Sequence, residues 1–139
     1  VRRVVEAAPA LGLQVLTLYA FSSENWKRPA DEVSDLMGLL KHYVQSEIDN
    51  LHRNGVRLDF IGNWRALKPD LVALLDRARE RTAGNQGLQL VMALNYGGQD
   101  ELVRAARRLA LDAAAGQLNP DDITPDTLEA RLDTAKWPL

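Results

Sequence analysis

The sequence predicts an α/β fold, in which a parallel sheet is flanked by helices and is incomplete at both ends. Three apolar runs of strand length, at 15–21, 56–61 and 88–94, alternate with longer segments of helical periodicity. Parallel strands need a long crossover connection between them, whereas antiparallel strands can be joined by a short turn. Ligands of such sheets bind beyond the carboxyl ends of the strands, so polar residues that follow an apolar run are the first candidates for a site.

The composition favours a single globular domain over residues 1–139. The chain is 46% hydrophobic and 26% charged, which suffices for a buried core. A formal net charge of -2 gives no indication of a nucleic-acid partner. The absence of cysteine leaves neither disulfides nor thiolate metal ligands, which is compatible with a cytoplasmic location. No apolar run approaches the ~20 residues of a membrane span.

The amino-terminal part is predicted to form a helix, a strand and a second helix. Apolar residues recur at helical spacing over 1–11, although Pro9 can end this helix early. The run 15–21 is the first strand, and residues 22–28 are predicted as a loop because they follow neither period. Pro29 fits the first position of the next helix, and two acidic residues in the first turn suit the helix dipole.

The helix predicted over 29–53 has an apolar face that is broader than a surface helix needs. From the residues alone, packing in the core is the favoured explanation, and lining of an apolar tunnel is the alternative. His42 and His52 have no companion ligands in the sequence, so a zinc site has little support. The apolar face consists of Val33, Leu36, Met37, Leu40, Val44, Ile48 and Leu51, with Leu39 and Tyr43 widening it.

Residues 56–61 alternate apolar and charged side chains and are predicted as the second strand. The helix predicted over 69–82 turns four apolar residues inward, and its arginines are expected to form a solvated basic face without a function. The inward residues are Leu71, Leu74, Leu75 and Ala78, and the arginines are Arg77, Arg79 and Arg81.

The third predicted strand, 88–94, leads to two glycines and a helix over 100–114. The glycines alone are weak evidence for a phosphate site, because no complete nucleotide-binding motif is present. Thr124 is expected to cap a short helix that starts at Pro125 and reaches about Leu132. The apolar stripe of the longer helix includes Leu102, Val103, Ala106 and Leu109.

The segment after the first strand carries the strongest indication of a site. Arg28 offers a planar donor fork for a phosphate or carboxylate, Ser22 and Ser23 are small donors, and Trp26 presents an apolar face. Together these groups suit an amphiphile with an anionic head. Each residue also has an ordinary structural explanation, since serines satisfy turn backbone and Arg28 could pair with a nearby carboxylate.

The string S-S-E-N-W-K-R-P at 22–29 closely resembles the signature of the cis-prenyltransferases, and among them the undecaprenyl diphosphate synthases. Further similarity lies in V-R-L-D-F-I-G at 56–62, in T-A-G-N-Q-G-L-Q-L at 82–90 and in A-L-N-Y-G-G at 93–98, so the resemblance spans nearly the whole chain. Two positions depart from the family pattern: Asn63 stands where Asp is usual, and Gln99 where Arg is common. These departures bear on hydrogen bonds at the sheet edge.

The resemblance implies a Z-specific chain elongation. The family condenses isopentenyl diphosphate with an allylic diphosphate, typically farnesyl diphosphate, in the presence of Mg2+, and builds a long polyprenyl diphosphate carrier lipid. Asn25 matches the family's proton acceptor, although a neutral amide is a poor base, so we expect it to orient a substrate instead. Positions matching substrate-binding residues are Ser22, Ser23, Glu24, Trp26 and Arg28, and positions matching the closed end of a product tunnel are Leu13, Val56 and Leu88.

The resemblance also predicts that parts of the site lie outside this sequence. The family's D-G-N-G-R-W loop and R-T-x-G-E-x-R-x-S segment, which supply the metal ligands, are expected before Val1 and after Leu139. We therefore expect an internal fragment with no metal site of its own and no activity alone. The alternative is a non-catalytic partner subunit of a heteromeric cis-prenyltransferase, but the intact 22–28 string favours an enzyme. A homodimer in the cytoplasm with peripheral membrane contact is carried over from the family.

Overall fold

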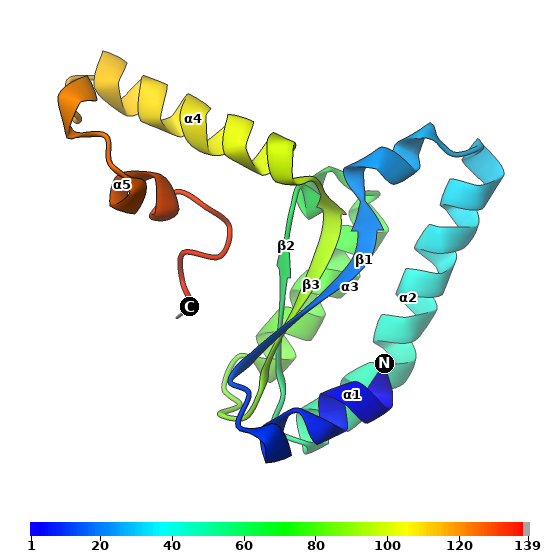
Figure 1. Cartoon of the computed structure of the whole chain (residues 1–139). Coiled ribbons are helices and arrows are strands. Elements are labelled where there is room, and N and C mark those ends of the chain that lie inside the picture. The colour runs from blue at the N-terminus through cyan, green and yellow to red at the C-terminus, as the bar shows by residue number, and fades with distance from the viewer. Residues whose placement is uncertain (138–139) are drawn as a thin grey trace. The chain divides into compact units, whose positions relative to one another are not determined.

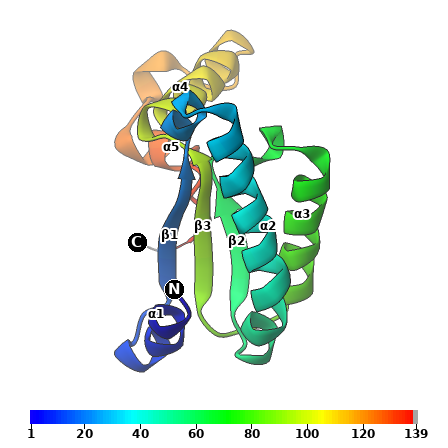
Figure 2. The same ribbon diagram turned by 90° about the vertical axis from the view of Figure 1, so that its right-hand side faces the viewer.

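The computed structural model describes residues 1–137, in two compact units, Val1–Asn95 and Tyr96–Leu139. The first unit contains a three-stranded sheet in the order β1-β3-β2, formed by β1 (Val15–Ser22), β2 (Arg57–Ile61) and β3 (Gln89–Tyr96). All three strands run in the same direction (Figures 1 and 2). The predicted parallel α/β fold is thus confirmed. Whether the two units behave as the single domain predicted from composition stays a prediction.

The register of the sheet places β3 between its two neighbours. Along the parallel pair β2 and β3, Arg57 lies opposite Gln89 and Ile61 opposite Ala93. The central strand has the near-continuous run of buried residues that is typical of a parallel sheet. It begins one residue later and ends two residues later than predicted, because hydrogen bonding along the sheet continues into the polar residues that follow the apolar run.

Two helices cover one face of the sheet (Figure 2). Helix α2 (Ala30–Arg53) and helix α3 (Pro69–Thr82) pack against each other and against β2. Helix α1 (Arg2–Ala7) is short because Pro9 ends it, and a 3-10 turn then leads to Gly12, whose φ of 77° places it in the left-handed region. The core includes Val5, Leu40, Val44, Leu51, Leu58, Phe60, Leu71, Leu75, Leu90 and Leu94.

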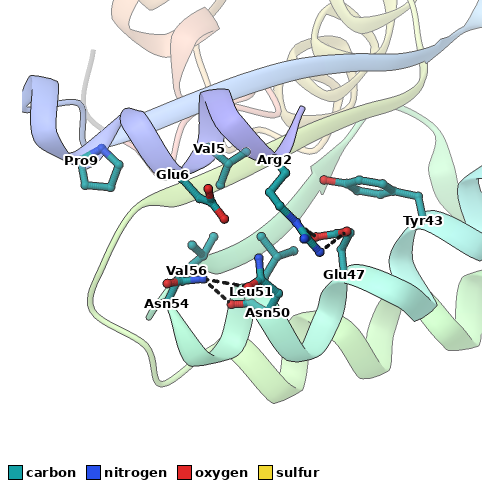
Figure 3. Close-up of a pocket in the computed structure, with 10 residues that line it drawn as sticks. All are labelled: Arg2, Val5, Glu6, Pro9, Tyr43, Glu47, Asn50, Leu51, Asn54 and Val56. Atoms are coloured by element: carbon teal, nitrogen blue, oxygen red, sulfur yellow. Dashed lines mark hydrogen bonds and ion pairs between the residues drawn. The ribbon is translucent and has the colours of Figure 1, made fainter.

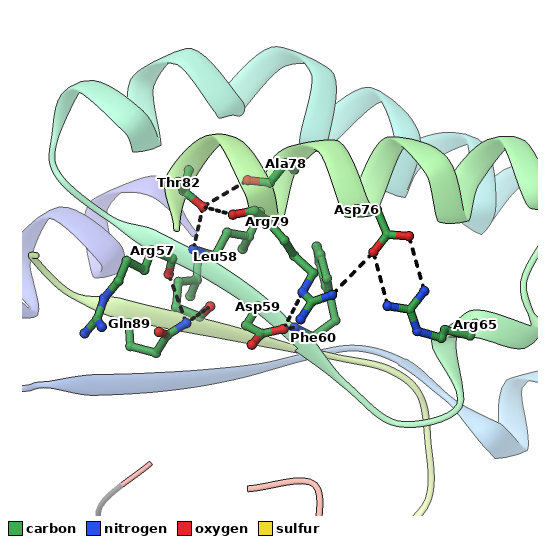
Figure 4. Close-up of polar contacts among 11 residues, drawn as sticks. Arg57, Leu58, Asp59, Phe60, Arg65, Asp76, Ala78, Arg79, Thr82 and Gln89 are labelled. Carbon is green, nitrogen blue, oxygen red and sulfur yellow. Dashed lines mark hydrogen bonds and ion pairs between the residues drawn. The ribbon is translucent and has the colours of Figure 1, made fainter. Parts of the chain in front are cut away.

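Polar side chains close the outer edge of β2 (Figure 4). The amide of Leu58 donates to Thr82 Oγ1 at 3.0 Å, and the amide of Phe60 donates to Asp59 Oδ1 at 2.7 Å. Asp59 also accepts from Arg79 Nε at 2.8 Å. These contacts satisfy outward amides of an edge strand that could otherwise pair with another chain.

The arginines of α3 are not the uniformly solvated face that the sequence predicted. Arg79 pairs with Asp59 and, at 3.3 Å, with Asp76, while Arg81 pairs with Asp49 of α2. Periodicity located these arginines on the polar side of the helix but could not reveal acidic partners that come from other elements.

The second unit contains α4 (Gly98–Ala114) and α5 (Pro125–Glu129). Helix α4 starts two residues before the predicted position, and Leu102 and Val103 of its expected apolar stripe are about half exposed. Thr124 Oγ1 accepts from the Thr127 amide, which confirms the predicted cap. Helix α5 ends before Leu132, because the following amides bond to carbonyls three residues back and form turns.

No helix in the described part of the chain has the length and hydropathy that crossing a bilayer requires.

Candidate functional site

The segment after β1 folds into a 3-10 helix, Ser23–Lys27, where the sequence predicted a loop. Asn25 Oδ1 accepts the Ser22 amide at 2.8 Å, and the Arg28 amide donates to the Asn25 carbonyl at 3.1 Å. A single turn of this kind is too short to produce a hydrophobic period, so the pattern could not reveal it. Pro29 is extended, with ψ of 145°, and α2 therefore begins one residue later than predicted.

The amide of Asn25 is oriented by its contact with Ser22. A backbone N–H is only a donor, so the atom it contacts must be the side-chain oxygen. This leaves the two N–H donors of Asn25 Nδ2, for which the described residues supply no hydrogen-bond acceptor. The Asn25 side chain therefore has N–H donors to offer, as the predicted orienting role would require.

Arg28 remains accessible at the end of this turn. Its guanidinium lies 3.7 Å from Glu32, one helical turn away, as the ordinary structural explanation expected. Both side chains are more than half exposed, at 56% and 54%, so the pair is weak and a diphosphate could displace it. Ser23 and Glu24 lie in the same turn and make no side-chain hydrogen bond within the described residues.

Trp26 connects this turn to the ends of the other two strands. Its indole Nε1 donates to Asn95 Oδ1 at 2.6 Å, and its ring meets Phe21 edge-on at 5.1 Å between centroids. Asn95 Nδ2 in turn donates to the Asn63 carbonyl at 2.7 Å, and the Asn63 amide donates to the Asn95 carbonyl at 3.1 Å. Because Asn63 uses only backbone atoms in these bonds, its departure from the family's Asp leaves them intact.

Sequence reasoning missed Asn95. Asn95 precedes Tyr96 and the two glycines, and only the glycines were considered as a possible phosphate site. Asn95 has φ of 49°, in the left-handed region that Asn tolerates better than most other side chains. An asparagine directly after an apolar run was the available signal.

An apolar groove runs between β1 and α2, so the broad face of α2 is not packed solid. The groove has a volume of about 240 Å³, and Leu39 on its rim is 65% exposed. This supports the tunnel alternative for part of that face, while Leu40, Val44 and Leu51 are buried in the core. The groove is lined by Val1, Leu18, Tyr19, Ala20, Leu36, Leu39, Leu40, Tyr43 and Met92.

Tyr43 also borders a second hollow, which lies farther along α2. Figure 3 shows the residues that line this second hollow. This cavity, of about 130 Å³, has Val5, Leu51 and Val56 as apolar lining. Arg2 and Glu47 form a two-bond ion pair at its side, at 2.8 and 3.2 Å. Burial raises the pKa of Tyr43 above its ordinary value, and the charge of Glu47 adds to this.

The three residues matching the closed end of a tunnel do not all meet at one place. Val56 is buried and lines the cavity beside α1 and α2. Leu88 is also buried, but it borders a neighbouring hollow together with Leu13, whose side chain is about half exposed. Val56 of the first hollow directly precedes Arg57, which borders the second hollow and whose amide donates to the Leu88 carbonyl at 2.8 Å.

The described residues do not build a divalent-metal site. Within residues 1–137, no three His, Asp or Glu side chains gather closely enough to hold a metal ion. Glu24 is the sole carboxylate of the 22–28 segment. His52 Nδ1 lies 3.2 Å from Asn85 Nδ2, an ordinary surface contact.

Comparison with known proteins decides the family. Residues 1–139 match the family described as "Putative undecaprenyl diphosphate synthase". The chain belongs to this family. It is 51% identical over 138 residues to isoprenyl transferase from Agrobacterium fabrum, covering 99% of this chain and 56% of that protein. It is 47% identical to a farnesyl-diphosphate-specific ditrans,polycis-undecaprenyl-diphosphate synthase from Pseudomonas aeruginosa, covering 100% of this chain and 55% of that protein.

Solved structures of the family share the fold. A lavandulyl diphosphate synthase from Lavandula x intermedia, in complex with dimethylallyl diphosphate, matches with a TM-score of 0.92 at 30% identity, over 96% of this chain and 58% of that one. A probable undecaprenyl diphosphate synthase from Campylobacter jejuni matches with a TM-score of 0.85 at 29% identity, over 96% and 61%. The chain thus spans little more than half the length of the curated relatives it matches.

Proposed function

We propose that the complete protein carrying this chain condenses isopentenyl diphosphate with an allylic diphosphate, with farnesyl diphosphate as primer, to make a long Z-configured polyprenyl diphosphate carrier lipid. One observation carries the proposal. The polar 22–28 turn and the apolar groove adjoin on one strand, since Ala20 of β1 lines the groove and Ser22 opens the turn. An amphiphile with a diphosphate head and an isoprenoid tail matches this pairing.

The reaction requires charge stabilisation more than a strong base. The C4 alkene of isopentenyl diphosphate attacks the allylic carbon, the carbon–oxygen bond to diphosphate breaks, and one C2 proton is lost. Negative charge develops on the departing diphosphate, where Arg28 would stabilise it by charge-assisted hydrogen bonds. Mg2+, held by ligands outside this sequence, would further neutralise that charge.

Asn25 would act as an orienting donor. Its oxygen is engaged by Ser22, and its Nδ2 hydrogens can bond a diphosphate oxygen. Ser22, Ser23, Glu24 and Trp26 would complete the substrate-binding turn. The departing diphosphate itself could accept the C2 proton, which keeps the proton balance without a protein base.

The groove would retain the growing chain. Each buried methylene contributes about 0.8 kcal/mol, so successive isoprenoid units favour continued occupation until the hollow is filled. Val56 would limit the cavity beyond Tyr43, and Leu13 and Leu88 the adjoining hollow. Product length would then depend on the bulk of these three side chains.

The proposal also covers the location, the oligomeric state and the membrane contact of the protein. We place the protein in the cytoplasm as a homodimer that touches the membrane peripherally, where a lipid product would be released. The alternative is a non-catalytic partner subunit of a heteromeric cis-prenyltransferase. Such a subunit would have no need of an accessible Arg28 or of donors on Asn25, so the open 22–28 turn favours the enzyme.

The test is elongation by the purified complete protein with farnesyl diphosphate, radiolabelled isopentenyl diphosphate and Mg2+. We expect a ladder of longer products, and Asn25→Ala should lower kcat by about a hundredfold while KM changes little, since an orienting donor acts on the reacting geometry. The matched control is Asn85→Ala, which removes an amide distant from the turn. A folded protein that makes no product alone but does so with a second subunit would establish the partner alternative.

A further inference from the structure

Asn95 joins the proposed substrate-binding turn to the rest of the sheet. Its amide oxygen accepts from Trp26, 69 residues earlier in the chain, and its amide nitrogen donates to the carbonyl of Asn63. The orientation is unambiguous because an indole N–H can only donate and a carbonyl can only accept. One side chain near the end of β3 therefore bonds the segments that follow β1 and β2.

The Asn95 side chain is buried, so the loss of either of its two hydrogen bonds would be costly. Asn95 is buried, with 7% of its surface exposed, whereas Trp26 is 47% exposed. A buried amide that loses a hydrogen-bond partner is costly, so Asn95 favours the position of Trp26 that satisfies its oxygen. The partly exposed indole also meets Phe21 edge-on, at 5.1 Å between ring centroids.

The backbone at Asn95 is held in a conformation that fits this task. Its φ of 49° lies in the left-handed region, where Asn is tolerated and most other side chains are strained. The Asn63 amide, bonded to the Asn95 carbonyl at 3.1 Å, fixes the same peptide from the other side. The acceptor for Trp26 is thus set by the sheet and does not depend on the turn.

We propose that Asn95 is a positioning residue, which holds the Trp26 indole and with it the 22–28 turn in the arrangement that binds substrate. This inference rests on the proposed function, because the turn is taken to bind the diphosphate substrates. Asn95 itself touches no substrate and acts through Trp26.

The experiment combines a spectroscopic and a kinetic readout on the complete protein. The Trp26 indole N–H resonance is assigned by its absence in Trp26→Phe, and Asn95→Gly is used because glycine accepts the positive φ without strain. We expect this resonance to move upfield in Asn95→Gly, since a hydrogen bond deshields the proton. The matched control, Asn63→Ala, should leave it in place, because the Asn63 side chain makes neither bond.

Kinetics test whether the bond matters for substrate. Asn95→Gly and Trp26→Phe should each lower kcat/KM by about tenfold or more, and the double variant should lose no more than the larger of the two single losses. A purely structural Asn95 would instead lower the unfolding midpoint, leave KM unchanged and give additive losses.

Either an unmoved indole resonance in Asn95→Gly or additive kinetic losses would overturn the inference. The proposed function fails separately, if the wild-type protein makes no prenyl product. In that case the resonance experiment still decides whether Asn95 holds Trp26.

Discussion

Two polar regions of the first unit differ in how many of their hydrogen-bonding and charged groups are paired within the protein. We call the edge of β2 the closed region and the 22–28 turn the open region. At the outer edge of β2, Arg79 pairs with both Asp59 and Asp76. Thr82 Oγ1 accepts from the Leu58 amide and donates to the Ala78 carbonyl (Figure 4). After β1, the described residues leave the Nδ2 donors of Asn25 without an acceptor and give Arg28 one ion-pair partner, the exposed Glu32 at 3.7 Å.

The difference separates stability from function. Groups that are already paired and partly buried contribute to folding, and a ligand would have to break their bonds to use them. Groups held in place by one bond, with further donors exposed, are prepared to bind a ligand at little cost. The arginines of α3 and Arg28 look alike in the sequence, and their partners distinguish them.

The largest expected effect tests the open region. Arg28→Ala should lower kcat/KM of the complete protein by about a hundredfold to a thousandfold, because a cation for the departing diphosphate is lost. The free energy of unfolding should change by less than about 0.5 kcal/mol, since the pair with Glu32 is exposed and long. Steady-state kinetics and urea unfolding measure the two quantities.

Arg65→Ala is the matched control for Arg28→Ala, because Arg65 pairs with Asp76 in the closed region at the edge of β2. It should leave kcat/KM within about threefold of the wild type. Equal kinetic losses in both variants would erase the distinction between the regions.

A second, smaller effect tests the closed region. Thr82→Val keeps the shape of this fully buried side chain but leaves the Leu58 amide without its acceptor. We expect a loss of about 1–3 kcal/mol in the free energy of unfolding and unchanged kcat/KM below the transition. Urea unfolding measures the loss. Thr82→Ser, which keeps the hydroxyl, should lose no more than about 1 kcal/mol, and a larger loss for Ser than for Val would refute the role of the bond.

The smallest effect concerns Tyr43, which borders both hollows. Its pKa is raised first by burial and then by Glu47, while Arg2 lowers it. A raised pKa in the folded state means that the associated stability is present below the ordinary tyrosine value near 10 and is lost as pH rises through the folded pKa. Glu47→Gln should therefore lower the pKa of Tyr43.

Phenolate absorbance during an alkaline titration, compared with Tyr43→Phe, measures this shift. Glu6→Gln is the matched control, because Glu6 lines the same cavity and does not contribute to the shift. An equal response to both substitutions would show that the charge of Glu47 does not raise the pKa of Tyr43.

Elements with long local patterns were predictable. Helix α3 occupies the predicted residues 69–82, and all three strands lie within two residues of their predicted bounds. These elements follow from periodicities of neighbouring residues, which any window of sequence contains. The family resemblance, read from the 22–29 string, was confirmed by the match over the full chain.

Features that depend on distant partners were not predictable. The contact between Trp26 and Asn95 and the ion pairs of Arg79 and Arg81 join residues from separate elements. Periodicity gave Leu39 and Leu40 of α2 similar apolar roles. The structure buries Leu40 and leaves Leu39 at the rim of a groove, because only the packed neighbours decide which side of a broad apolar face is covered.

The sequence by itself determined the alternation of strands and helices, the parallel sheet and the family, since each depends on residue types at fixed local spacing. Tertiary structure alone decided which polar groups are paired and which remain open to a ligand. Hydrogen bonds and burial depend on atoms of residues as far apart in the sequence as 26 and 95, and a local sequence pattern contains no information on such contacts.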